Sequence, residues 1–194
     1  MKLSTRRLSL RPPLLADVPA LFEHGSREDV ALPAGFPRQE SIADARRYVM
    51  TSLRDWKKTG LRRMTFAILL KPSKRWIGGF NLRWPHDGVG EIGYSIQADH
   101  WGRGYAAEAG RRVLELAFSE FGAHRVQATS WVKNQRSAGV LRKLGLRKEG
   151  RLRGYLKRAG VVRDEFMWGI TREDWLKKKV HSNSGKKLST EPDR

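Results

Sequence analysis

The chain contains no cysteine, which excludes disulfides, thiolate metal ligands and a cysteine nucleophile. No stretch approaches 18 consecutive apolar residues, and the N-terminus lacks the apolar segment of a secretion signal. The five histidines have neither H-x-x-x-H spacing nor a cysteine partner, which argues against a bound metal. Together these absences favour a cytoplasmic protein that needs no metal and neither enters nor crosses a membrane.

Acidic residues are scarce as well, because 20 Asp and Glu stand against 39 Lys and Arg, for a net charge of +19. Residues 133–163 hold eleven basic residues and a single acid, Glu149, and residues 177–194 hold six basic and two acidic residues. A field of this sign attracts acidic partners and repels polycations. An ordinary solvated surface is the alternative interpretation, and the sequence leaves both open.

The length of 194 residues is that of one domain large enough to bury its own core. Residues 181–194 are polar and charged and lack apolar periodicity, which is typical of disorder. We therefore expect a single domain over residues 1–176 and a basic, disordered tail over residues 177–194.

The most informative stretch is residues 91–109, EIGYSIQADHWGRGYAAEA. Apolar and polar side chains alternate over residues 91–97, which predicts a half-buried strand. Gly102 and Gly104 permit a tight turn, and helical periodicity follows over residues 105–121. Free N–H groups and the positive end of the helix dipole converge where such a turn enters a helix. The stretch therefore predicts a site for a pyrophosphate.

Three phosphate-binding patterns compete for this turn. The GRGYAA segment matches the dinucleotide fingerprint, but the next strand, residues 125–131, carries no acid for a ribose. A P-loop requires Gly-Lys-Ser or Gly-Lys-Thr, which does not follow. The third pattern, Gln or Arg followed by x-x-Gly-x-Gly/Ala, fits Trp101-x-x-Gly104-x-Ala106 except at its first position. A turn that only caps a helix is the remaining alternative.

The third pattern belongs to the GNAT acyltransferases, and the WGRGYA-x-EA context resembles their RimJ/RimL branch, whose members acetylate the N-termini of ribosomal proteins. RRLSLRPPLLAD near the N-terminus resembles the RLxLRP…D opening of that branch. Asn134-x-x-Ser137, followed by LGL and then Glu149-Gly150, is similar to its second motif, N-x-x-S…KLGF…EG. The resemblance covers residues 4–176 with the motifs in the required order. It implies the GNAT fold, an α/β (α+β) domain with helices flanking a mixed, mostly antiparallel central sheet.

Hydrophobic periodicity, helix-capping residues, glycines and prolines predict the elements between the motifs. We expect Asp17 and Asn134 to cap helices, Ser41 and Asp44 to form a capping box, and Gly145 to close a helix. In chain order, the expected elements are a strand (5–12), a helix after Asp17, a loop (31–37), a helix from Ser41 that Gly60 ends, three antiparallel strands (64–70, 75–84, 91–96), a helix (105–121), a strand (125–131), a helix capped by Asn134, a hairpin (147–157, 162–170) and a short helix (172–178). The resemblance places the 31–37 loop along the acceptor site.

The resemblance implies acetyl-coenzyme A as the co-substrate. The backbone N–H groups of Arg103, Gly104 and Ala106 are the choices for binding its pyrophosphate. The same turn includes Trp101, Gly102 and Tyr105.

In the family the strand before the turn splays open, and one of its backbone N–H groups polarises the thioester carbonyl. Here that donor is expected near Ser95 or Ile96. Asn134 is expected along the pantetheine arm, with Arg136 or Arg142 near the nucleotide phosphates.

Because a cysteine is lacking, we expect the amine to attack the thioester directly in a ternary complex. Ser137 is the candidate general acid, since Leu141 stands where many GNAT enzymes have a tyrosine; an ordinary hydroxyl in a first helical turn is the alternative. Glu91 is the candidate base, directly or through water, with a salt bridge at the strand edge as its alternative. Tyr155 is expected either in the acceptor pocket or in the core.

The weak case for a base bears on the acceptor. A peptide α-amino group, with a pKa of about 8, is roughly one-tenth unprotonated at neutral pH, whereas a lysine at about 10.4 is less than one-thousandth unprotonated. We therefore expect a protein N-terminus or a small amine, acidic in character, and not a polyamine. A non-catalytic ribosome- or RNA-associated binding module is the second class, although the basic segment lacks interleaved aromatic residues. Monomer and homodimer both stay open.

Overall fold

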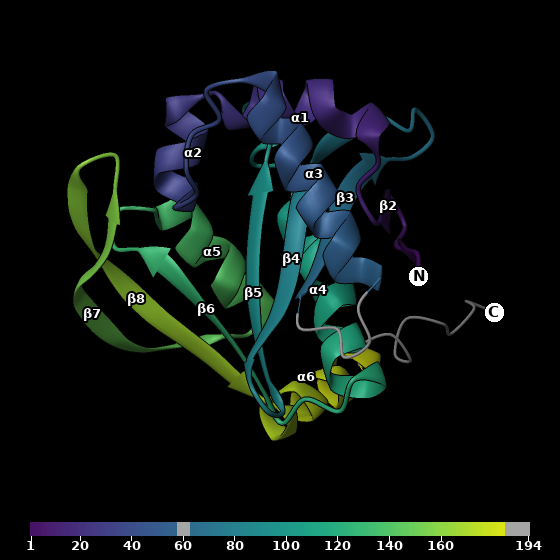
Figure 1. The fold of residues 1–194 in the computed structure, drawn as a ribbon. Coiled ribbons are helices and arrows are strands. Elements are labelled where there is room, and N and C mark those ends of the chain that lie inside the picture. Colours follow the sequence, from purple (N-terminus) through teal and green to yellow (C-terminus); the bar gives the residue numbers. More distant parts are fainter. Residues whose placement is uncertain (58–62, 185–194) are drawn as a thin grey trace.

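The computed structural model describes residues 1–57 and 63–184, with side chains through Val180 (Figure 1). Within these residues, eight strands form one sheet in the order β1-β2-β3-β4-β5-β6-β8-β7. The strands are β1 (Leu3–Ser4), β2 (Leu8–Arg11), β3 (Arg63–Leu70), β4 (Trp76–His86), β5 (Val89–Ile96), β6 (Arg125–Trp131), β7 (Arg147–Arg158) and β8 (Val161–Thr171). The helices are α1 (Val18–Gly25), α2 (Glu28–Ala34), α3 (Ile42–Lys57), α4 (Tyr105–Glu115), α5 (Gln135–Leu144) and α6 (Arg172–Ser184).

Helices cover both faces of the sheet, and this explains why the sequence of β3 is almost continuously apolar. Met64, Phe66 and Ile68 lie in the main core together with residues of α4 and α5. Ala67 and Leu69 point to the other face, where they pack with residues of α1 and α3. Because successive side chains of a strand point to opposite faces, both sets are buried, and RMTFAILL reads as one apolar run.

The sheet is mixed but mostly antiparallel, as predicted. β3, β4 and β5 form the expected meander, and β7 and β8 the expected hairpin. The one parallel pair among the described strands, β5 with β6, extends only from Val89 to Glu91 on one strand and from Arg125 to Gln127 on the other. Beyond these residues the strands separate, as Figure 1 shows, and the edge of β5 from Ile92 to Ile96 faces a gap inside the sheet.

The ends of α5 confirm two local predictions. Asn134 Oδ1 accepts a hydrogen bond from the Ser137 N–H at 3.0 Å, which caps the first turn. Gly145 has a φ of 93°, and the Leu146 N–H donates to the Leu141 carbonyl at 3.0 Å. This is the left-handed closure that LGL predicted.

The other two predicted helix starts have different outcomes. Ser41 and Asp44 form the capping box, since the Asp44 N–H donates to Ser41 Oγ at 3.2 Å and the Ser41 N–H to Asp44 Oδ2 at 2.9 Å. Asp17, by contrast, does not cap α1 with its side chain. Its carboxylate accepts hydrogen bonds from both terminal nitrogens of Arg11, at 2.7 and 2.8 Å, and from the Leu14 N–H at 2.7 Å. Asp17 therefore stabilises the turn before α1.

Two predicted elements differ from the structure. Residues 5–12 were expected to form one strand, and the strand β2 does lie there, but it is confined to Leu8–Arg11 and pairs with the short, unpredicted β1. Residues 31–37 were expected to be a loop, but α2 runs into this segment. Pro33 lies in the last turn of that short helix, which Gly35 closes with a φ of 76°. Pro33 is thus tolerated inside this short helix, and only Gly35 ends it.

Two helices end differently from the prediction. The helix expected over residues 105–121 turns π-helical over Leu116–Glu120, and α6 continues to Ser184, past the expected end at Lys178 and into the predicted tail. The predicted stop at Gly60 and the remainder of the tail, residues 185–194, lie outside the described residues.

We expect Gly145→Ala to lower the free energy of unfolding by about 1–2 kcal/mol, because a side chain at a left-handed φ is strained. Gly139→Ala in the same helix is the matched control. An added Cβ there meets no atom within 4 Å, so the change should raise stability by about 0.5–1 kcal/mol. Urea unfolding of both variants measures the difference, and equal effects would contradict the assignment.

Candidate active site

The turn between β5 and α4 has the geometry of an anion site. Gly102 and Gly104 have φ angles of 75° and 77°, and Gly104 is the N-cap of α4, without a side chain to bond the first N–H groups of the helix. A Cβ added to Gly102 meets no atom within 4 Å, so the space before the turn is open. The backbone conformation therefore demands these glycines, and the free N–H groups suit a negatively charged group.

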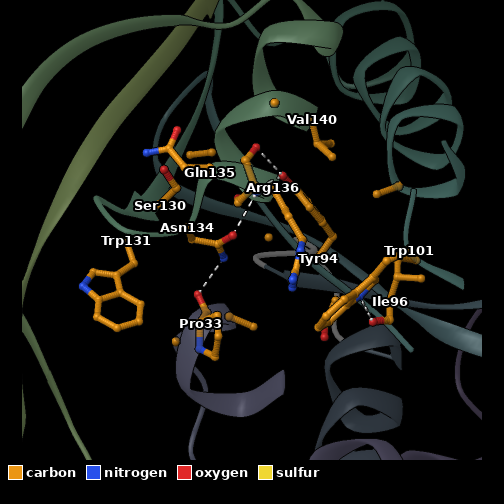
Figure 2. Close-up of a pocket in the computed structure, with 18 of the residues that line it drawn as sticks. Pro33, Tyr94, Ile96, Trp101, Ser130, Trp131, Asn134, Gln135, Arg136 and Val140 are labelled. Atoms are coloured by element: carbon orange, nitrogen blue, oxygen red, sulfur yellow. Dashed lines mark hydrogen bonds between the residues drawn. The ribbon is translucent and has the colours of Figure 1, made fainter. Parts of the chain in front are cut away.

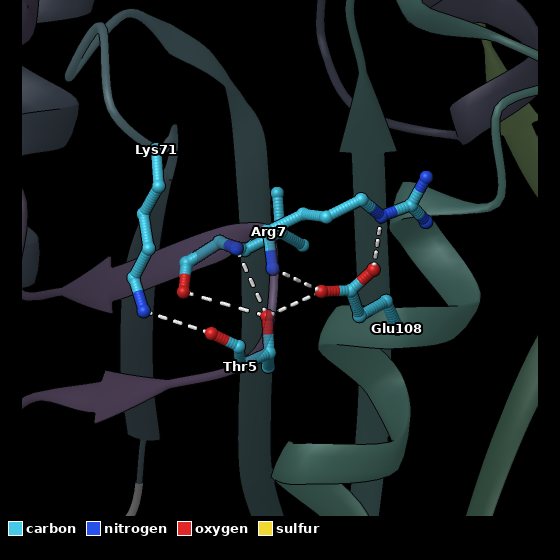
Figure 3. Close-up of polar contacts among 5 residues, drawn as sticks. Thr5, Arg7, Lys71 and Glu108 are labelled. Atoms are coloured by element: carbon cyan, nitrogen blue, oxygen red, sulfur yellow. Dashed lines mark hydrogen bonds and ion pairs between the residues drawn. The ribbon is translucent and has the colours of Figure 1, made fainter.

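A partly buried carboxylate in the first turn of α4 attaches this turn to the N-terminal hairpin (Figure 3). Glu108 Oε1 accepts hydrogen bonds from Thr5 Oγ1 at 2.5 Å and from the Arg7 N–H at 2.8 Å, and Oε2 accepts from Arg7 Nε at 2.6 Å. The Arg7 guanidinium also lies 4.6 Å from the centroid of the Tyr105 ring. Burial raises the pKa of Glu108, but the hydrogen bonds from Thr5 and Arg7 outweigh it and hold that pKa below its ordinary value.

This contact was not predicted, because no local pattern indicates that the start of the chain meets a helix about 100 residues later. Arg7 brings positive charge to the turn, since its Nη2 lies 3.6 Å from the position of a Cβ on Gly104. The N-terminal hairpin therefore contributes to the anion site both mechanically and electrostatically.

Trp101 holds the other side of the turn. Its indole Nε1 donates to the Ile96 carbonyl at the end of β5, at 2.7 Å (Figure 2). The guanidinium of Arg136 lies 4.2 Å from the centroid of the Trp101 ring. Arg142 stacks instead on Trp168, at 6.0 Å, and does not line the site. The structure thus brings Arg136, but not Arg142, to the turn.

A cavity of about 550 Å³ fills the gap between β5 and β6. Its walls come from the turn, the diverging end of β5, the end of β6, α5 and α2 (Figure 2). Most of the predicted site residues line it, namely Ser95, Ile96, Trp101, Gly102, Gly104, Tyr105, Ala106, Asn134, Arg136 and Ser137. Arg103 belongs to the turn but is not a wall residue.

Two hydroxyl groups meet on one wall. Tyr94 Oη lies 3.0 Å from Ser137 Oγ and donates to the Ser137 carbonyl oxygen at 3.1 Å. Burial raises the pKa of Tyr94 well above its ordinary value, although the hydrogen bond with Ser137 opposes the shift. Both hydroxyls are therefore neutral at physiological pH and able to donate a proton. The second motif pointed to Ser137, whereas Tyr94 was expected only to lie in a strand.

Asn134 is already engaged at both ends of its amide. Besides capping α5, it donates from Nδ2 to the Pro33 carbonyl of α2 at 3.0 Å. Figure 2 shows this link across the cavity wall. The side chain therefore positions α2 against α5, a role that the cap pattern alone did not reveal.

Glu91 does not line this cavity. Its Oε1 accepts hydrogen bonds from Arg83 Nε at 3.0 Å and from Arg83 Nη2. Its Oε2 accepts a hydrogen bond from Gln127 Nε2 at 3.3 Å. The structure therefore contains the salt bridge to an arginine that was the alternative interpretation of Glu91. Tyr155 does not line this cavity and is 52% exposed, so its interpretation as a core residue was wrong.

A buried ion pair that sequence reasoning missed lies in the cavity wall. Arg163 Nε is 2.8 Å from a carboxylate oxygen of Glu165, and both side chains are 3% exposed. Arg163 also donates to the Leu32 carbonyl, and Arg158 Nε donates to the Gly35 carbonyl at 3.1 Å. Burial raises the pKa of Glu165 and lowers that of Arg163. These contacts attach the end of α2 to the β7–β8 hairpin.

A second cavity of about 660 Å³ lies on the face of the sheet covered by α1 and α3. The two cavities share Ala34, Gly93, Tyr94 and Ser95 as wall residues. The diverging end of β5 is therefore a partition between a space that ends at an anion site and a second space on the opposite face. This arrangement suits two substrates that react across the partition.

The comparisons with known proteins agree with this arrangement. A family model described as an acetyltransferase (GNAT) domain matches residues 7–147. The chain is 30% identical over 175 residues to the uncharacterized N-acetyltransferase p20 of Bacillus licheniformis, over 89% of this chain and 97% of the relative. It is 32% identical over 173 residues to the uncharacterized N-acetyltransferase YoaA of Bacillus subtilis, over 88% and 96%. The chain therefore belongs to the GNAT family of N-acetyltransferases, and its co-substrate is acetyl-coenzyme A.

Solved structures share the fold. A GNAT acetyltransferase from Bacillus anthracis superposes with a TM-score of 0.76 at 27% identity, over 89% of this chain and 99% of that chain. Spermidine N-acetyltransferase from Vibrio cholerae, in complex with CoA and spermine, has a TM-score of 0.76 at 18% identity, over 89% and 99%. A shorter sequence match, 33% over 84 residues, is to the [ribosomal protein uS5]-alanine N-acetyltransferase of Escherichia coli, over 43% of each chain.

Two other properties concern the described residues as a whole. Among the side chains of residues 1–57 and 63–180, no three His, Asp or Glu residues gather as ligands for a metal ion. In the same part of the chain, no helix combines the length and the apolar composition needed to cross a bilayer.

We expect Glu108→Gln to lower the free energy of unfolding by about 1–2 kcal/mol at pH 7, through loss of charge-assisted hydrogen bonds. A lowered folded-state pKa stabilises the protein above the unfolded pKa, and this contribution disappears as the pH falls through the folded value. The difference between wild type and variant should therefore shrink below about pH 4.5. Thermal unfolding at several pH values measures it.

Glu115→Gln is the matched control on the same helix. Glu115 is 44% exposed and its ion pairs are long, at 3.5 and 3.6 Å, so its effect should stay within about 0.5 kcal/mol. A Glu108 effect that does not depend on pH would contradict the electrostatic explanation.

Proposed function

We propose that this GNAT N-acetyltransferase acetylates the N-terminal α-amino group of a protein, in the way of enzymes that act on ribosomal proteins. We further propose that this acceptor protein or peptide is acidic. The observation that carries the proposal is the partition at β5, where two cavities meet beside neutral hydroxyl groups and away from Glu91. Among the described residues, those that the two cavities share include no strong base, so an amine that is partly unprotonated at neutral pH is the better substrate.

The similarity to the ribosomal protein uS5 alanine acetyltransferase supports this acceptor class, although it covers less than half of the chain. The positive charge of residues 133–163 supports an acidic acceptor and, as part of the proposal, association with the ribosome. Some of that charge serves the fold, because Arg147 pairs with Asp174 at 3.2 Å and Arg151 with Asp164 at 2.6 Å. The remaining exposed basic residues supply the field.

Acetyl-coenzyme A supplies the acetyl group as a thioester. In the proposal, the backbone N–H groups of Arg103, Gly104 and Ala106 bind its pyrophosphate in the open space before the turn. Arg136, beside Trp101, supplies charge for the phosphates, and the wall containing Asn134 borders the pantetheine.

The register of β5 selects the donor for the thioester carbonyl. The Gln97 N–H donates to the Ile77 carbonyl of β4 at 2.8 Å. Because successive N–H groups of a strand point in opposite directions, the Ser95 N–H also faces β4, whereas those of Tyr94 and Ile96 face the gap. The Ile96 N–H therefore becomes the choice over that of Ser95.

The acceptor amine attacks the acetyl carbonyl carbon, so that a C–N bond forms and the C–S bond breaks. The departing sulfur takes a proton from Ser137 Oγ, Ser137 recovers one through Tyr94 Oη, and Tyr94 is in turn reprotonated from solvent. The amine nitrogen releases its surplus proton to solvent, and the products are an amide and a free thiol.

The cofactor site is tested by calorimetry with acetyl-coenzyme A. Gly104→Asp should abolish micromolar binding, because it places an anion where the pyrophosphate would lie. Gly122→Asp is the control, since Gly122 also has a positive φ, 66°, and open space around it. Equal binding by both variants would contradict the pyrophosphate site.

The acceptor class is tested by turnover of the same protein with a panel of amines. The panel contains hexapeptides with a free N-terminal alanine, one acidic and one basic, together with spermidine. We expect the acidic peptide to have the highest kcat/KM. Faster acetylation of spermidine would overturn the proposed acceptor, whereas acetyl-coenzyme A binding without turnover of any amine would overturn the transferase role.

We expect Ser137→Ala to lower kcat by roughly 100-fold while the Kd for acetyl-coenzyme A changes less than about twofold, as loss of a general acid would. Tyr94→Phe should have a smaller effect, because Ser137 can recover a proton from water. Single-turnover kinetics at saturating acetyl-coenzyme A provides the measurement. Unchanged kcat in Ser137→Ala would eliminate its role as acid.

A further inference from the structure

A buried histidine and a serine meet at the point where the two cavities join. Ser95 belongs to the partition, and its side chain lies on the same face of β5 as Gly93, two residues earlier. A Cβ added to Gly93 would meet no atom within 4 Å. There is therefore open space beside Ser95, in the wall of the second cavity.

His24 of α1 reaches Ser95 from that face. Its Nε2 lies 2.6 Å from Ser95 Oγ, and the side chain is 5% exposed. The imidazole packs edge-on against Trp76, with 5.4 Å between ring centroids, and at a tilt against Phe36, at 6.2 Å. Two aromatic rings thus fix the imidazole in one orientation, and its only hydrogen bond within the described residues goes to Ser95.

The imidazole is neutral at physiological pH. Burial, reinforced by the nearby charge of Arg27, lowers the pKa of His24 to about 4, although Asp29 opposes the shift. A neutral imidazole can accept the hydroxyl proton of Ser95 at Nε2. Ser95 Oγ then keeps its lone pairs free for a donor that approaches from the open side.

We propose that Ser95 Oγ binds an N–H of the acceptor amine and that His24 is a positioning residue that orients this hydroxyl. The amine is thereby held at the partition with its lone pair free to face the acetyl group on the other side. The inference rests on the proposed function and adds the contact that places the acceptor. It assigns the second cavity to the acceptor.

A double-mutant cycle tests the pair with the acidic hexapeptide, at saturating acetyl-coenzyme A. We expect Ser95→Ala to raise the KM for the peptide about tenfold, the effect of one lost hydrogen bond, with kcat much less affected. His24→Phe keeps a ring in the same place and should raise the KM less. Because His24 acts through Ser95, the double variant should be no worse than Ser95→Ala alone.

Additive effects of the two substitutions would overturn the positioning role, as would an unchanged KM in Ser95→Ala. Calorimetry with acetyl-coenzyme A on each variant separates the possible failures. If the variants bind acetyl-coenzyme A normally and their KM is unchanged, only the proposed role of Ser95 and His24 is contradicted. If the wild-type protein does not bind acetyl-coenzyme A, the proposed function itself is contradicted. Thermal unfolding confirms that each variant is folded.

A second variant tests the position of the acceptor without touching the pair. Gly93→Val places a side chain in the open space beside Ser95 and should also raise the KM for the peptide by about tenfold or more. Gly150→Val, in β7 and outside both cavities, is the control, because a Cβ there also meets no atom within 4 Å. Equal KM values for the two variants would overturn the assignment of the second cavity.

Discussion

The separation of β5 from β6 is the constraint on which the site depends. Two parallel strands that pair only at Val89–Glu91 and Arg125–Gln127 leave backbone groups unpaired in the middle of a sheet. Such groups are tolerated where a ligand or water satisfies them, which suits a binding cleft. The anion-binding turn, α5 and α2 surround the gap, and each of them is held by contacts with distant parts of the chain.

These distant contacts are mostly polar. Glu108 attaches the turn to the N-terminal hairpin, Asn134 attaches α5 to α2, and the arginines of the β7–β8 hairpin bind the carbonyls at the end of α2. Polar contacts of this kind require defined geometry, so they fix the position of each wall more closely than apolar packing would. The buried pair of Arg163 and Glu165 belongs to this framework, in which each charge compensates the other.

Charge also has two roles in this protein. The sequence indicated a basic segment over residues 133–163, yet several of its arginines form ion pairs or hydrogen bonds with other parts of the same chain. Conversely, His24 looked unremarkable in the sequence, but burial keeps it neutral and places it against Ser95. The function of each ionisable group was decided by its surroundings and not by its position in a charged or uncharged segment.

The sequence by itself determined what depends on neighbouring residues: the Ser41–Asp44 box, the Asn134 cap, the closure at Gly145, the meander and the glycine turn. Motif order was enough to predict the fold and most of the first cavity. Tertiary structure alone decided the pairing of Glu91 with Arg83, the choice of Arg136 over Arg142, and the contacts of Glu108 and His24. The pairing of Glu91 with Arg83 depends on the register of β4 and β5. The other contacts join residues far apart in the chain, and local periodicity carries no information about which distant side chains share one cavity.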